Sequence, residues 1–146
     1  MITLRNFSEE DAIVLQKKKY REKTIAEIQQ KIQDMSTKVY NDKYFEMFAV
    51  MKEFGVVGIL SLYEHTKSIV STEIEIFEQE RRKGYGTCAL SSVLGVAKLK
   101  GYKIATAQIR VDNVASVALN EKVNFELDHE YVNTKGNQVY FMLRAL

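Results

Sequence analysis

The segment 81–87 combines cations and glycines in a pattern suited to binding phosphate. Three consecutive cations precede Gly84, and Gly86 follows two residues later. The segment stands between a β-rich run, 69–77, and a helical pattern, so it is expected to lie at a helix N-terminus. Free N–H groups and a partial positive charge at such an end attract anions, and glycine lets the main chain approach a ligand closely. The sequence therefore predicts a pyrophosphate site here.

Two familiar nucleotide motifs do not fit this segment. The loop Gly-x-x-x-x-Gly-Lys-Ser/Thr needs its lysine after the last glycine, whereas Lys83 precedes Gly84. The dinucleotide pattern Gly-x-Gly-x-x-Gly fails because Ala89 occupies its third glycine position. A solvated basic turn before a helix is the alternative interpretation of the same residues.

A second segment with a recognisable spacing lies downstream. Asn113-x-x-Ser116 opens a short helical pattern that leads to Lys122-x-Asn124-Phe125. An asparagine at this place is explained equally well as a helix N-cap, whose side chain accepts a main-chain N–H. The cap role and a ligand role are compatible, so the spacing keeps both open.

The two segments, in this order, resemble the GCN5-related N-acetyltransferase (GNAT) superfamily. Arg81-x-x-Gly84-x-Gly86 is similar to the Arg/Gln-x-x-Gly-x-Gly/Ala signature by which that family binds the pyrophosphate of coenzyme A. The downstream segment is similar to the family's Asn-x-x-Ser/Ala helix and its Lys-x-Gly-Phe ending, with Asn124 where glycine is common. The resemblance covers essentially the whole chain.

This resemblance implies a fold, a co-substrate and a set of contacts. The fold is a single GNAT-like α/β domain over 1–146, whose mixed sheet opens beside the strand ending near Phe77. Acetyl-CoA is the co-substrate, its pantetheine lies along the main chain of 75–78, and no metal ion is needed. The residues that the resemblance places on the coenzyme are Glu75, Ile76, Phe77, Glu78, Arg81, Arg82, Lys83, Gly84, Tyr85, Gly86, Thr87, Asn113 and Ser116.

Acetyl transfer to an amine needs a neutral nucleophile, which points to the glutamates of the run 69–77. At pH 7, deprotonating an α-amine costs about 1.4 kcal/mol and a lysine-like amine about 4.6 kcal/mol. Glu73 is our first candidate for the general base and Glu75 the second, either directly or through water. An alternating glutamate on the wet face of a strand is the alternative interpretation. The oxyanion is expected to be held by a main-chain N–H of 75–78.

Asn120 stands where many relatives place a tyrosine that protonates the departing sulfur. An amide cannot replace that acid, although it can hydrogen-bond the sulfur. A thiol of pKa about 8.5 leaves as the thiolate at pH 7 for only about 2 kcal/mol. The loss of the tyrosine therefore slows the reaction without forbidding it, and Asn120 is the candidate partner of the sulfur.

The hydrophobic periodicity predicts the elements that must position these residues. The order is β-α-α-β-β-β-α-β-α-β-β, with strand–helix–strand crossovers in the second half. A helix is expected to begin at Ser8, a hairpin to turn at 52–55, and Gly101 to end the best helix. In the last helix, Ala115, Ala118 and Leu119 are expected to face inward. The predicted strands are 2–6, 45–51, 56–63, 69–77, 104–109, 125–133 and 138–144, and two of the later helices cover 25–35 and 113–123. The best helix is identified by Leu90, Val93, Leu94 and Ala97, which fall on one face.

Composition sets limits on the class of protein. The chain has 146 residues, 46% hydrophobic and 27% charged, which is typical of one globular domain, and its net charge of +2 argues against a nucleic-acid binder. There is no signal-peptide pattern and no apolar run long enough for a membrane span. Cys88 is the only cysteine, which favours the cytoplasm, and we expect it to pack as a small hydrophobe.

Two functions remain open at this stage. The first is an acyl-CoA-dependent N-acetyltransferase that acts on a primary amine, either a small amine or a protein N-terminal amine, by direct attack in a ternary complex. The second is an acyl-CoA sensor without turnover, which the missing tyrosine favours. The resemblance also allows a homodimer formed through the late strands.

Overall fold

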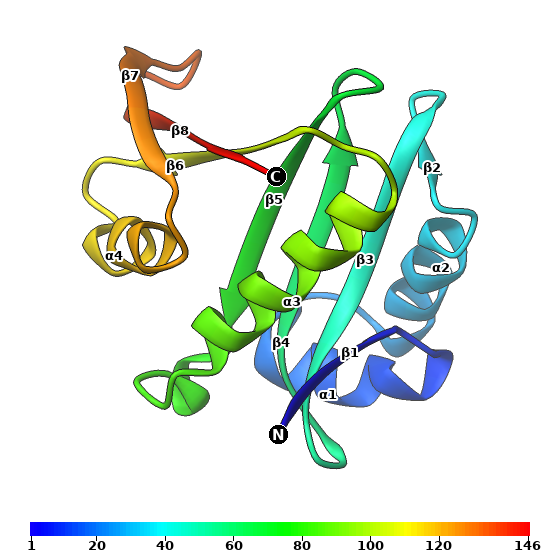
Figure 1. Ribbon diagram of the computed structural model, residues 1–146. Helices are drawn as coiled ribbons and strands as arrows, with labels where there is room; N and C mark the ends of the chain where they lie inside the picture. Colours follow the sequence, from blue (N-terminus) through cyan, green and yellow to red (C-terminus); the bar gives the residue numbers. More distant parts are fainter.

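The computed structural model describes all residues 1–146 and contains one mixed sheet, shown in Figure 1. Its strand order is β1-β3-β4-β5-β6-β8-β7, and β2 pairs with β3 outside this path. The strands are β1 Ile2–Asn6, β2 Val39–Tyr40, β3 Lys43–Lys52, β4 Gly55–Glu64, β5 Ile69–Ile76, β6 Ile104–Arg110, β7 Glu126–Val132 and β8 Gln138–Ala145. The helices are α1 Ala12–Lys18, α2 Ile25–Met35, α3 Tyr85–Leu99 and α4 Val114–Lys122.

This order confirms the predicted succession of elements, with additions. Strand β2 and the short 3-10 turns Glu9–Asp11 and Glu78–Glu80 were not expected. The β3–β4 hairpin turns over only Glu53 and Phe54, and Glu53 adopts the left-handed region (φ 55°), which the tight turn requires. Gly101, with φ 98°, follows the end of α3 as predicted.

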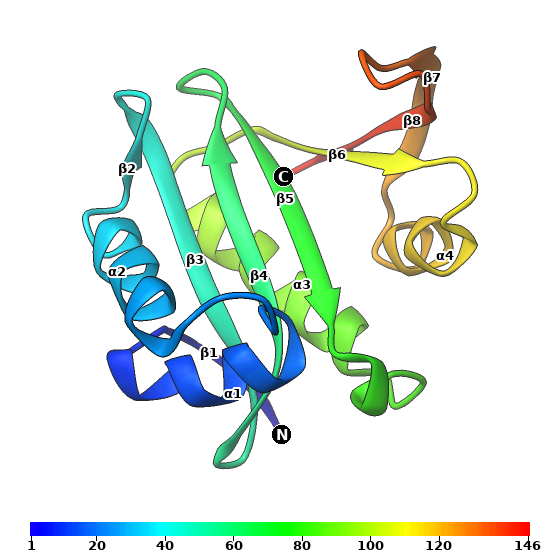
Figure 2. The same ribbon diagram turned by 180° about the vertical axis from the view of Figure 1, so that it is seen from behind.

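Helices cover the two faces of the sheet unequally. Helix α3 packs on one face, whereas α1 and α2 pack on the other, as the opposite views in Figures 1 and 2 show. The α3 face holds the larger core, which includes Leu60, Val70 and Leu90. The α1–α2 face holds a smaller core, in which Ile28 and Phe77 are fully buried. Neighbouring residues of β4 thus serve two separate cores, Leu60 the larger one and Ile59 the smaller one.

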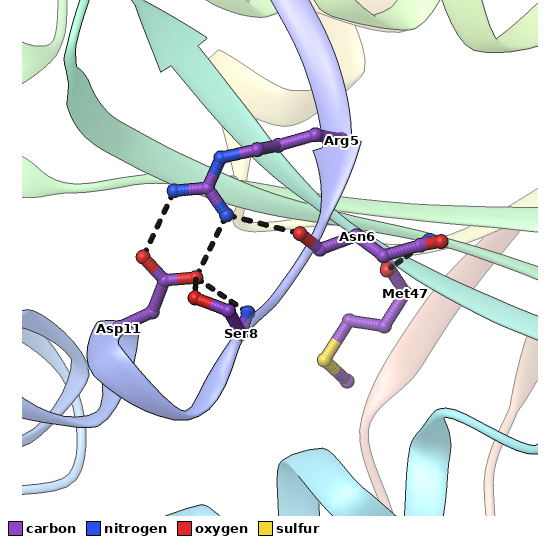
Figure 3. A network of polar contacts seen from close by, with 5 residues as sticks. All are labelled: Arg5, Asn6, Ser8, Asp11 and Met47. Atoms are coloured by element: carbon purple, nitrogen blue, oxygen red, sulfur yellow. Dashed lines mark hydrogen bonds and ion pairs between the residues drawn. The ribbon is translucent and has the colours of Figure 1, made fainter.

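A partly buried ion pair fastens the start of the first helical segment to β1 (Figure 3). The Asp11 carboxylate accepts two hydrogen bonds from the Arg5 guanidinium, at 2.8 and 2.9 Å, and one from the Ser8 main-chain N–H at 2.7 Å. Burial raises the pKa of Asp11, but the bonds from Arg5 and Ser8 outweigh burial and hold that pKa below its usual value. The negative charge of Asp11 is therefore part of the fold.

The sheet opens between β5 and β6. The two strands pair in parallel only over Ile69–Ser71 and Ile104–Thr106, after which they diverge. Strands β6, β8 and β7 and helix α4 consequently form a second wing, set apart from the β3–β4–β5 wing in both views (Figures 1 and 2). The predicted opening of the sheet is confirmed, and it begins at the middle of β5 rather than at its end.

Candidate active site

The opening between the two wings forms a cleft of about 1270 Å³. It passes from the start of α3 to the uncovered part of the α1–α2 face. Twelve of the predicted site residues line it: Glu73, Glu75, Ile76, Arg81, Arg82, Gly84, Tyr85, Gly86, Thr87, Asn113, Ser116 and Asn120. Three others, Phe77, Glu78 and Lys83, lie outside the lining.

One end of the cleft, which we call the glycine end, is the main chain of Arg82–Thr87. The first hydrogen bond of α3 runs from the Cys88 N–H to the Gly84 carbonyl (3.3 Å), and none of the six N–H groups from Arg82 to Thr87 donates within the chain. Gly84 caps the helix with φ 80°, and a side chain there would point into open space. Six free donors at a helix N-terminus make an anion site of the kind the sequence predicts.

The cations of the glycine end have different tasks. Arg82 lines the cleft, is exposed and adopts the left-handed region (φ 65°). Lys83 turns aside to Glu80, 3.3 Å away. Arg81 donates from Nε to the Ile76 carbonyl (2.8 Å), which fastens the loop to the end of β5. Arg82 is thus the cation of this segment whose side chain lines the cleft without a partner in the chain.

The edge of β5 presents main-chain groups to the cleft. The Phe77 N–H donates to Val57 and the His65 N–H to Ile69, so odd-numbered residues of β5 hydrogen-bond with β4. Even-numbered residues point the other way, and the N–H groups of Ile74 and Ile76 therefore face the opening. The Ile76 carbonyl is already taken by Arg81. A linear ligand in the cleft would meet a strand edge with free donors.

Phe77 has a packing role that the sequence analysis did not foresee. Its ring is buried under α1 and α2, its N–H donates to Val57 and its carbonyl accepts from the Glu80 N–H (2.8 Å). This engagement corrects its placement among the residues expected on the coenzyme. Within 75–78, the free N–H groups that remain are those of Ile76 and Glu78.

Helix α4 forms the opposite wall. The Asn113 side chain caps it by accepting the Ser116 N–H (3.2 Å), as the cap interpretation predicts. Ala115 and Ala118 are exposed and line the cleft, so the expectation that they face inward is wrong. Leu119 is half-buried and packs against the larger core, as expected. Asn120, 3% exposed, also turns inward, and its amide donates to the Ser116 carbonyl (2.9 Å). The helix therefore shows small side chains to the cleft.

Three carboxylates line the cleft, and two of them are already paired. Glu75 forms an ion pair with Lys19 at the end of α1, and Glu80 pairs with Lys83. Glu73 is exposed and has no ion-pair partner. Glu73 is left as the carboxylate free to act on a ligand.

The other end of the cleft contains residues that the sequence analysis missed. We call it the aromatic end; its members are Phe45, Tyr63, His65, Ser71 and Glu73. The sheet register sets Phe45 opposite Tyr63 and Tyr63 opposite Ser71. The Ser71 hydroxyl also contacts His65 Nε2 and lies 2.8 Å from the Thr106 hydroxyl, where β5 and β6 part. Because this row depends on strand register, no local motif announces it.

Two further features lie away from the cleft. Cys88 is exposed on α3, so the expectation that it packs as a small hydrophobe is wrong. A hollow of about 70 Å³ lies between α1, α2, β3 and β4, lined mainly by apolar side chains such as Leu15 and Ile28. None of the predicted site residues reaches it. No three His, Cys, Asp or Glu side chains are grouped as metal ligands.

Comparison with known proteins identifies the class. The family model described as "Acetyltransferase (GNAT) domain" matches residues 2–126. A ribosomal L7/L12 alpha-N-protein acetyltransferase, RimL, in complex with coenzyme A superposes with a TM-score of 0.88 at 16% identity, covering 99% of this chain and 94% of that one. The spermidine N-acetyltransferase of Vibrio cholerae, with CoA and spermine, gives 0.81 at 16% identity, covering 99% and 95%. A search of the curated proteins gave no match.

The splayed sheet and its glycine end thus define an acetyltransferase. The chain belongs to the GNAT acetyltransferase family, since the family model covers most of its length. A third structure of this fold, YncA of Salmonella typhimurium with acetyl-CoA, has a TM-score of 0.77 at 15% identity and covers 99% and 94% of the two chains. No helix is long and apolar enough to span a bilayer.

Proposed function

We propose that this protein transfers the acetyl group of acetyl-CoA to a primary amine by direct attack within a ternary complex. The observation that carries the proposal is the row of six free N–H groups at the glycine end, which stands at the mouth of the opened sheet. The acceptor is a small amine or a protein N-terminal amine, the two kinds of substrate named for the structural neighbours. The single cysteine supports a cytoplasmic location, and the exposed edge strand β7 is compatible with a homodimer.

The glycine end would hold the pyrophosphate of the coenzyme. Helix-terminal N–H groups donate to its oxygens, and Arg82 adds a screened positive charge. Pantetheine would follow the free edge of β5, where the N–H groups of Ile74 and Ile76 face the cleft. Asn113 and Ser116 on α4 border the same space. These contacts bring the thioester beside the end of β5.

The chemistry at the thioester then needs an oxyanion donor and a base. The amine nitrogen attacks the carbonyl carbon, and the resulting oxyanion accepts a hydrogen bond from the Ile76 N–H, the free donor of 75–78 on the cleft lining. Glu73 lies three residues before Ile76, about 10 Å along the strand, so it takes the ammonium proton through intervening water. The collapse of the intermediate breaks the C–S bond and releases the thiolate of coenzyme A.

The thiolate departs without a tyrosine acid. Asn120 is buried, and one of its N–H groups is committed to the Ser116 carbonyl. Any help that it gives to the sulfur is therefore a hydrogen bond and not a proton. A thiolate of pKa about 8.5 leaves unaided for about 2 kcal/mol at pH 7, so the proposed mechanism expects solvent to protonate the sulfur.

Thiol release from acetyl-CoA, measured with a panel of amines and checked by the mass of the acetylated product, tests the proposal. Sustained release that depends on the amine supports the transferase. Asn120 in the tyrosine position favours the sensor alternative, which predicts tight binding of acetyl-CoA without turnover. Pure protein that binds acetyl-CoA by calorimetry but acetylates no amine of the panel would contradict the transferase.

A further inference from the structure

Three aromatic rings meet beside the cleft without filling a core. Tyr40, Phe45 and Tyr63 have ring centroids 6.0 to 6.3 Å apart, and each pair is inclined, at 53°, 59° and 75°. Tyr40 is 51% exposed, and neither Phe45 nor Tyr63 is buried. Rings set at steep angles with open faces form the kind of aromatic cage that binds an ammonium group through cation–π attraction.

The cage lies on the part of the sheet that the helices leave uncovered. Helices α1 and α2 cover the sheet where Ile59 and Phe77 are buried, whereas Figure 2 shows the β2 end of β3, β4 and β5 without a helix in front. Phe45 and Tyr63 line the cleft itself. Two of the three rings thus border the far end of the space that Glu73 also lines, and Tyr40 packs against them from outside that lining.

Register places the cage one row of side chains from Glu73. Tyr63 pairs with Ser71 and Ser61 pairs with Glu73, so Tyr63 and Glu73 are diagonal neighbours on the same face. Diagonal positions on paired strands lie about 7–8 Å apart. This span matches the distance between the two nitrogens of an extended alkyl diamine of about five methylene groups.

Near the cage, Glu73 and Lys43 are charged side chains without an oppositely charged partner. The carboxylate of Glu73 has no basic partner, whereas the neighbouring cations are engaged. Lys19 pairs with Glu75 and Arg110 pairs with Asp112. Lys43 donates to the neutral His65 carbonyl at 2.7 Å, which fixes its ammonium group there but leaves its positive charge in place. A second ammonium at the cage would therefore meet the three rings, while the carboxylate of Glu73, one diagonal position away, faces the reacting amine.

We propose that the aromatic cage of Tyr40, Phe45 and Tyr63 selects acceptors that carry a second ammonium group, with the reacting amine near Glu73. The inference rests on the proposed function, and it names the class of acceptor as alkyl diamines. A protein N-terminal amine with neutral side chains would leave the cage unused.

The test compares cadaverine, a five-carbon diamine, with hexylamine, in which a methyl group replaces the second ammonium. The ratio of their kcat/KM values is expected to exceed about tenfold in the wild type. Tyr63→Leu and Tyr40→Leu should each lower this ratio about five- to thirtyfold through loss of cation–π attraction. The KM for acetyl-CoA should stay unchanged, because the glycine end is intact.

Two control variants separate the cage from general effects. Tyr63→Phe keeps the ring and should keep the selectivity. Phe54→Leu removes a fully exposed ring at the tip of the β3–β4 hairpin, which is not part of the cleft lining, and should not change the ratio. Tyr40 lies at the surface, so Tyr40→Leu tests the cage even where Tyr63→Leu fails to fold.

Several outcomes would overturn the inference. A ratio near one in the wild type, a ratio unaffected by both leucine variants, or faster turnover of a neutral N-terminal peptide would each do so while leaving the transferase standing. If no amine is acetylated, the proposed function fails, and calorimetry with cadaverine decides the cage. Binding lost in Tyr40→Leu supports the cage, and the absence of binding overturns it.

Discussion

The two ends of the cleft are built from different parts of the chain. The glycine end uses main-chain N–H groups from six consecutive residues, Arg82–Thr87, at one helix terminus. The aromatic end uses side chains from β3, β4 and β5, which only the strand register brings together. The diphosphate of acetyl-CoA can thus be held by a local motif. The surface for the acceptor amine depends instead on the exposed side chains of three strands.

This difference predicts where substitutions act. Changes of single side chains at the glycine end should matter little, because main-chain groups do the binding. Changes at the aromatic end should alter catalysis or selectivity, since each side chain there is itself the functional group. The predictions below separate the two ends by asking whether the effect falls on acetyl-CoA or on the amine.

The largest effect is expected for Glu73→Gln. The amide cannot accept a proton, so kcat with an alkyl amine should fall about 10²- to 10⁴-fold, whereas the KM for acetyl-CoA should change little. Glu75→Gln is the matched control, because Lys19 already occupies the Glu75 carboxylate. Steady-state kinetics measure both, and a larger loss in Glu75→Gln would reverse the assignment of the base.

Gly58→Ala tests the pairing of β4 with β5, the strand that contributes to both ends of the cleft. A Cβ at Gly58 would lie 2.5 Å from the Glu75 carbonyl oxygen and 3.1 Å from the Ile76 Cα, so β5 must shift. Overpacking of this kind costs about 3 kcal/mol of unfolding free energy. Gly95→Ala, in α3, meets no atom within 4 Å and should stabilise the protein by about 1 kcal/mol. Urea denaturation compares the two, and equal stabilities would contradict the steric account.

Asp11→Asn tests whether the helices beside the aromatic end depend on the ion pair of Figure 3. Loss of the charged hydrogen bonds from Arg5 should cost about 2 kcal/mol. The folded pKa of Asp11 lies below its usual value, so its contribution is present in full above the unfolded pKa of about 3.9 and is lost as the pH falls through the folded value. The stability gap between wild type and variant should therefore close in acid. A gap that persists well below the folded pKa would show that the charge is not its source.

The sequence predicted the glycine end well because its causes are local. Gly84 and Gly86 stand at the start of a helix that periodicity alone defines, and the free N–H groups follow from that position. The burial of Phe77 in the smaller core depends on the positions of α1 and α2 and so could not be predicted from the run 69–77 itself.

The aromatic end escaped prediction for a similar reason. Phe45 and Tyr63, together with Tyr40 of the adjoining cage, are spread over 24 positions of sequence, from residue 40 to residue 63, and each is unremarkable in its own strand. The orientation of α4 could not be predicted from its own sequence either. Its alanines face the open cleft and Asn120 faces inward, and this depends on how the helix sits against the rest of the fold. Helical periodicity identifies a stripe of small or apolar residues but not which stripe meets solvent.

The smallest effect is expected for Arg82→Ala. Its guanidinium is exposed and has no ion-pair partner, so its attraction for phosphate is screened. The KM for acetyl-CoA should rise about two- to fivefold at low salt, and the difference should shrink as ionic strength increases. Lys83→Ala should change less, because Lys83 pairs with Glu80 outside the cleft lining.

A loss above about fiftyfold for Arg82→Ala would mean that a side chain, and not the main chain, holds the coenzyme. The statement that main-chain groups bind the coenzyme at the glycine end would then be wrong. A fiftyfold loss corresponds to more than 2 kcal/mol, which exceeds what an exposed charge supplies. A small, salt-dependent change would instead leave the six N–H groups as the principal ligands of the diphosphate.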